Sequence, residues 1–214
     1  MMMFSAISRL MKGFCPFITA GRCCRLWRLF VPEALDRNFD PQPLIRSGIS
    51  FVQKEPLNLT GRNVVLGFAD TGIDYRNPVF RREDGSTRIL AIWDQSVQTG
   101  TPPDGLIYGS EYTREQINEA LQLDNPLELV PVTDDIGHGT AMASAAAGSA
   151  LNGGIDFLGA APDADIVVVK LKQAKQFLRD YYMTPPGVPA YGTNDIMLAV
   201  KYLSSFCIPF HRPA

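Results

Sequence analysis

The chain has 214 residues, of which 46% are hydrophobic and 20% are charged, and its formal net charge is −2. This length and composition are typical of one globular domain or part of a larger one, and no excess of basic residues indicates a nucleic-acid partner. The four cysteines form no CxxC pair and lie at no metal-ligand spacing from a histidine, which disfavours a zinc site or a disulfide framework.

Residues 1–57 are expected to be an N-terminal appendage, or the remnant of a pro-segment, that ends in a proline-containing connector. Arg9, Lys12 and Arg22 interrupt the apolar run that a secretory signal peptide requires, and no clear small-residue cleavage site is present. No segment reaches the length of about 20 apolar residues needed to cross a bilayer, so no membrane span is expected. Composition does not indicate an oligomeric state.

Residues 58–214 are expected to form an α/β domain. Short apolar runs rich in β-branched residues predict three buried strands, at residues 63–69, 88–95 and 164–172. Capping residues and helical spacing of apolar residues predict helices that begin near Thr113, at the "GHGT" stretch and at Thr193. The segment 96–135 is expected to be a long surface excursion that contains the first of these helices. Strands that alternate with helices favour a parallel sheet flanked by helices.

Two polar residues lie where the predicted elements meet. Asp70 follows the strand 63–69 and opens a "DTG" turn, while His138 begins the small-residue helix between Gly137 and Gly139. In a parallel α/β sheet, functional groups gather where strands end and helices begin. An aspartate that accepts a hydrogen bond from one imidazole nitrogen fixes the tautomer, so that the other nitrogen can act as a general base. We therefore predict that Asp70 and His138 form a catalytic pair.

The stretches "DTGID" and "GHGT", followed by "AAG", resemble the subtilisin-like serine peptidases, the subtilase family, in which aspartate comes first, histidine second and serine last. The likeness covers about residues 58–205 and is greatest to subtilases of anaerobic Bacillota, including the spore-germination branch. It implies the N-terminal part of a subtilisin-like three-layer α/β fold and a serine endopeptidase by ancestry, with a peptide or protein substrate. Together with the absence of a clear signal peptide, it favours a cytoplasmic or spore-associated location over secretion.

The resemblance also assigns Asp134, four residues before the histidine, to an acidic position that lines the substrate cleft. The family's nucleophile lies in a "GTS" motif, and this motif does not occur in the 214 residues. The serines after His138 lack that context; they are Ser144, Ser149, Ser204 and Ser205. We therefore expect a catalytic domain truncated before its serine, with no nucleophile in this chain and no peptide hydrolysis by the chain alone.

Many subtilases hold a stabilising calcium ion in the loop after the histidine helix. In this sequence Gly153 stands where the family has an asparagine ligand, and Val79 matches the partner aspartate. Hard cations need several oxygen ligands, so we expect no calcium here and no other metal or cofactor.

Two alternatives remain open. A non-catalytic relative of the family, a pseudoprotease, would bind peptides or regulate an intact homologue through the cleft near Asp134. "FADTGID" also resembles the hydrophobic-Asp-Thr-Gly signature of aspartic peptidases, in which two such aspartates share a proton. That class has a small residue where Ile73 stands, and it leaves "GHGT" unexplained.

Overall fold

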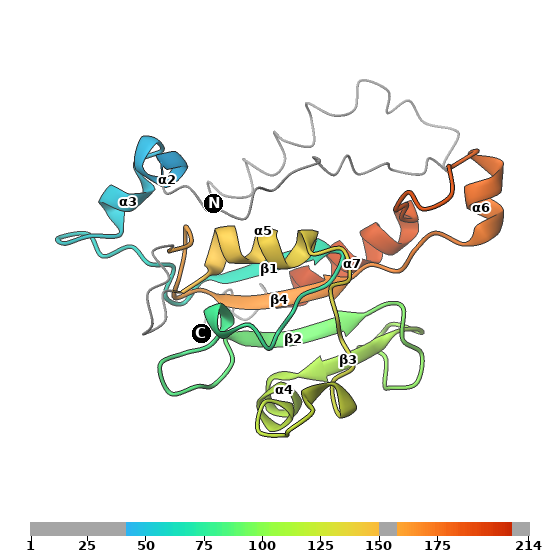
Figure 1. Cartoon of the computed structure of the whole chain (residues 1–214), viewed down its shortest axis with the longest axis horizontal. Coiled ribbons are helices and arrows are strands. Elements are labelled where there is room, and N and C mark those ends of the chain that lie inside the picture. Colours follow the sequence, from blue (N-terminus) through green and yellow to red (C-terminus); the bar gives the residue numbers. More distant parts are fainter. Residues whose placement is uncertain (1–41, 150–157, 207–214) are drawn as a thin grey trace, which may run out of the picture.

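The computed structural model describes residues 42–149 and 158–206, in which a four-stranded sheet carries helices on both faces (Figure 1). The strand order is β1-β4-β2-β3. The strands are β1 (Val65–Asp70), β2 (Ile89–Asp94), β3 (Ser110–Thr113) and β4 (Asp165–Lys170). Strands β1, β4 and β2 are parallel, whereas β3 pairs with β2 in the antiparallel direction. The predicted α/β class is confirmed, with a mixed sheet.

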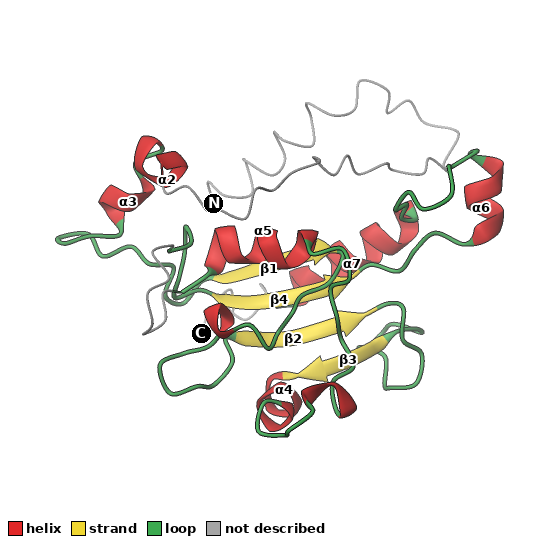
Figure 2. Ribbon diagram, in the orientation of Figure 1, coloured by secondary structure: helices red, strands yellow, loops and turns green. Residues whose placement is uncertain are grey.

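The two main helices cover opposite faces of the sheet. Helix α5 (His138–Ala147) lies along one face and α7 (Thr193–Ser205) packs against the other (Figure 2). On the central strand β4, Ile166 and Val168 join the core under α5, while Val167 and Val169 join the core under α7. All four side chains are fully buried, as expected for a parallel strand that is covered on both faces.

The predicted helices are present. Helix α4 (Arg114–Ala120) begins as expected, because the Gln116 side chain accepts a hydrogen bond of 2.9 Å from the backbone N–H of Thr113. The short elements that the pattern did not predict are α2 (Gln42–Arg46), α3 (Ile49–Val52), α6 (Gln176–Tyr181) and the 3₁₀ turns η1 (Pro78–Phe80) and η2 (Pro126–Glu128). None of the described helices is long and apolar enough to cross a bilayer.

The expectation for residues 96–135 was wrong in part. This segment supplies β3, and it also returns Val130 and Val132 to the core on the α5 side, where both are fully buried. The Tyr75 hydroxyl donates a hydrogen bond of 2.9 Å to the carbonyl of Val130. Pro131 separates the two valines, so they bury their side chains without forming a strand ladder that a pattern could reveal.

The connector is attached to the domain. The Gln53 side chain donates to the carbonyls of Gly159 and Ala160, at 2.7 and 3.2 Å, just before β4. The predicted appendage up to residue 41 lies outside the described residues, and so does Gly153, where a calcium ligand of the family is expected to be lost.

Candidate active site

The end of β1 and the start of α5 bring together the two residues that the sequence predicts as a pair. Asp70 is the last residue of β1 and His138 is the first residue of α5. Nδ1 of His138 lies 2.7 Å from Oδ1 and 2.9 Å from Oδ2 of Asp70. Their side chains are 13% and 12% exposed, so the contact is largely shielded from water while part of the imidazole still reaches the surface. This arrangement allows the carboxylate of Asp70 to accept a hydrogen bond from a protonated Nδ1, and it leaves Nε2 for another partner.

Two glycines allow the strand end and the helix start to approach this closely. A Cβ atom added at Gly139 would lie 2.2 Å from the carbonyl oxygen of Gly72 and 3.1 Å from Cβ of Asp70. Gly72 has a φ of +129°, and a Cβ atom there would lie 2.6 Å from the carbonyl oxygen of Thr133. The helix start therefore packs backbone to backbone on the "DTG" turn, where a side chain at either position would collide.

Asp134 lies at the centre of a hydrogen-bond network beside this pair. Its Oδ1 accepts from the Thr71 hydroxyl at 2.7 Å and from the backbone N–H of Gly137 at 2.9 Å. Its Oδ2 accepts from the backbone N–H and the hydroxyl of Thr140, at 2.8 and 2.7 Å. Burial acts to raise the pKa of Asp134, but the hydrogen bonds from Thr71, Thr140 and Gly137 outweigh it and lower the pKa. Its predicted place in a substrate cleft stays a prediction.

The two threonines of this network were not singled out by the sequence. The Thr71 hydroxyl accepts from the backbone N–H of Gly139 at 2.9 Å, and the Thr140 hydroxyl accepts from that of Asp74 at 2.9 Å. The backbone N–H of Thr71 also donates to Oδ1 of Asp70 at 2.7 Å. The available signal was the threonine inside each motif, since hydroxyl side chains commonly bond to backbone groups at turns and helix starts.

The serines that follow His138 are occupied elsewhere. Each of their hydroxyls donates to a backbone carbonyl: Ser144 to Thr140, Ser149 to Val79, Ser204 to Lys201 and Ser205 to Tyr202. Within residues 42–149 and 158–206, the hydrogen bonds of the His138 ring go to Asp70 and to no serine. In the described part of the chain, the imidazole of His138 therefore contacts a carboxylate and no serine hydroxyl.

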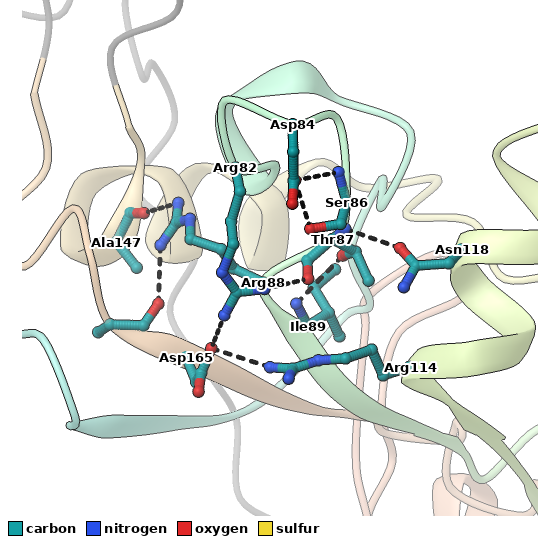
Figure 3. A network of polar contacts seen from close by, with 11 residues as sticks. Arg82, Asp84, Ser86, Thr87, Arg88, Ile89, Arg114, Asn118, Ala147 and Asp165 are labelled. Carbon is teal, nitrogen blue, oxygen red and sulfur yellow. Dashed lines mark hydrogen bonds and ion pairs between the residues drawn. The ribbon is translucent and has the colours of Figure 1, made fainter.

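The carbonyl of Val79 is bound by a buried arginine. The Val79 carbonyl accepts a hydrogen bond of 2.7 Å from the Arg88 guanidinium. The same guanidinium donates to the carbonyl of Ala147, at the end of α5 (Figure 3), and to the carbonyl of Ala164. Arg88 is only 3% exposed, and burial lowers its pKa to about 10, so it remains a cation at neutral pH. A buried guanidinium thus binds three backbone carbonyls at this place. The expectation that no calcium is bound stays a prediction. In the described segments, no cluster of three or more His, Cys, Asp or Glu side chains could hold a metal.

The sequence model described as "Subtilase family" matches residues 61–184, more than half of the chain. The chain belongs to the subtilase family. Among solved structures, this subtilase is similar to one titled "Structure of the Clostridium Perfringens CspB protease", with 29% sequence identity and a TM-score of 0.64. That match covers 81% of this chain and 32% of the other chain, so this subtilase spans about a third of the length of the structure that it matches. A search of curated proteins found no match.

Proposed function

We propose that this chain carries the acid–base half of a serine-peptidase site, with His138 as the proton carrier and Asp70 as its orienting carboxylate. The observation that supports this most directly is the contact of 2.7 Å between Nδ1 of His138 and Asp70, on elements of a subtilase-family chain. The substrate would be a peptide or a protein, as is general for the family.

The chemistry proposed for the pair follows from which nitrogen is engaged. Asp70 accepts the hydrogen bond from Nδ1, so the unprotonated Nε2 can take a proton from a hydroxyl nucleophile. The imidazolium that forms is stabilised by the same carboxylate, because the two charges are close and largely shielded from water. Later in the cycle His138 would return this proton to the leaving amine.

A nucleophile for this pair is not found in the 214 residues. No serine of the described residues bonds to His138, and none in the 214 residues lies in a "GTS" context. Removal of the nucleophile costs a subtilase about a million-fold in turnover. We therefore propose that this polypeptide alone forms no acyl-enzyme and does not hydrolyse peptides.

Labelling with a serine-directed fluorophosphonate tests this proposal, with an intact subtilase as the positive control and hydrolysis of a casein substrate as a second readout. The expected result is no covalent adduct on the purified chain and no release of peptides above the buffer blank. A fluorophosphonate adduct on any serine, abolished by substitution of that serine with alanine, would contradict the proposal.

A further inference from the structure

We infer that Asp134 is a positioning residue, which holds the Asp70–His138 pair together through a threonine relay instead of contacting the substrate. This inference rests on the proposed function, since it concerns how the contact between Asp70 and His138 is maintained. It differs from the role that the family resemblance gives to Asp134, which is to line the substrate cleft.

The first support is that donors of the protein itself occupy the acceptor positions of the Asp134 carboxylate. Each of its two oxygens accepts two hydrogen bonds, all between 2.7 and 2.9 Å. A carboxylate oxygen has about two good lone-pair directions, so four donors leave little acceptor capacity for a substrate amide. The donors come from the turn after β1 and from the start of α5, so one side chain ties both elements together.

The second support is the position of the relay relative to the pair. Oγ1 of Thr71 donates to Asp134 and accepts from the backbone N–H of Gly139. Thr71 is covalently next to Asp70, and Gly139 is covalently next to His138. The relay therefore bonds the neighbour of one member of the pair to the neighbour of the other, and a shift in either element must break it.

The third support is that an uncharged copy of the side chain cannot replace it. Asparagine at position 134 has the same shape, but its NH₂ group, which can only donate, replaces one of the two carboxylate oxygens. At either oxygen position this NH₂ group would face two hydrogen-bond donors of the protein. On the Oδ2 side these donors are the backbone N–H and the hydroxyl of Thr140. The Thr140 hydroxyl already accepts from the backbone N–H of Asp74, and a backbone N–H cannot become an acceptor. Asp134→Asn therefore removes donor–acceptor matches and keeps the volume.

The test follows the proton on Nδ1 of His138 by NMR in a His211→Gln background, which removes the only other histidine of the chain. Asp134→Asn is compared with Asp135→Asn, which makes the same charge change at the exposed neighbouring position. Thr71→Val is compared with Thr71→Ser, which keeps the hydroxyl. We expect Asp134→Asn and Thr71→Val to speed exchange of the Nδ1 proton with water by about tenfold or more, the effect of losing an ordinary hydrogen bond. Asp135→Asn should leave the exchange rate within about twofold of the parent, since exposed changes are usually nearly neutral. Thr71→Ser should do the same, because serine keeps the hydroxyl that bonds to Asp134 and Gly139.

The outcomes separate this inference from the proposed function. If the parent chain shows no protected Nδ1 proton, or if Asp70→Asn leaves that proton unchanged, the proposed pair fails. If the proton is present and depends on Asp70, but folded Asp134→Asn and Thr71→Val retain it, the pair stands and the positioning role of Asp134 is overturned. Should circular dichroism show that Asp134→Asn does not fold, the comparison of Thr71→Val with Thr71→Ser decides alone.

Discussion

The close packing of α5 on the turn after β1 can be tested by adding one methyl group. In Gly139→Ala the new Cβ would lie 2.2 Å from the carbonyl oxygen of Gly72, and 3.1 Å from both Cβ of Asp70 and the backbone nitrogen of Gly72. Ordinary contacts between heavy atoms lie near about 3.5 Å, so the two backbones must separate by roughly 1 Å. Because the carbonyl oxygen of Gly72 belongs to the backbone, no rotation of a side chain can relieve this collision.

Two opposing contributions set the size of the effect. Alanine is favoured over glycine inside a helix by about 1 kcal/mol, which would stabilise α5 if the site were open. Overpacking of a tight contact costs about 1–3 kcal/mol, and a backbone collision belongs at the upper end of that range. The difference predicts that Gly139→Ala lowers the free energy of unfolding by about 1–2 kcal/mol. The same separation of backbones should lengthen the contact between Asp70 and His138.

Urea unfolding followed by circular dichroism measures the first effect, and the protected Nδ1 proton of His138 reports the second. Gly137→Ala is the matched control, since a Cβ added at that neighbouring glycine has no atom within 4 Å. That control should cost only the strain of its left-handed backbone, φ +83°, and should retain the Nδ1 signal. Gly139→Ala that is more stable than the parent, with an unchanged Nδ1 signal, would refute the close packing.

Three further predictions follow from charges outside the pair. Burial opposes ionisation of Asp134, but its hydrogen bonds lower its pKa on balance. The ionised carboxylate therefore stabilises the fold fully above the usual aspartate pKa of about 4. This stabilisation is lost as the pH falls toward the lowered pKa of Asp134 in the folded chain. Asp134→Asn should therefore weaken the fall of the unfolding free energy at acid pH, as measured by urea unfolding at a series of pH values; a variant with the same pH dependence as the parent would contradict this. Arg88→Met should lower the free energy of unfolding by about 2–4 kcal/mol, because the carbonyls of Ala147 and Ala164 lose their donor; a variant as stable as the parent would contradict this. Excess chelator should leave the thermal unfolding midpoint unchanged, and a clear fall in that midpoint would reveal a metal site.

Much of the sheet could be predicted because its central strands bury both faces. The run 164–172, which forms β4, is a nearly continuous apolar stretch that local composition reveals. The run 63–69 was also predicted as a buried strand, but it forms the edge strand β1, whose residues are only partly buried or exposed. Strand β3 could not be predicted in this way, since it has only four residues and pairs on one side alone, with β2. The burial of Val130 and Val132 likewise depends on a fold that returns an irregular segment to the core.

The pair itself was predictable because each member stands at a junction that the pattern marks. Asp70 ends a strand before a glycine turn, and His138 starts a helix between two glycines. The relay through Thr71 and Asp134 was not predictable, because these residues are 63 positions apart and their contact exists only once α5 lies on the turn. Arg88 gave no signal either, since a lone arginine at the start of a strand is usually exposed.

The most direct test of the central claim is nitrogen NMR of the neutral imidazole of His138, in the His211→Gln background. The account predicts that the proton resides on Nδ1, held by Asp70, and that Nε2 is bare. Asp70→Asn should disturb this tautomer, while Asp74→Asn should not, because the carboxylate of Asp74 bonds to the guanidinium of Arg76. A proton on Nε2 in the parent chain, or a tautomer indifferent to Asp70, would contradict the account.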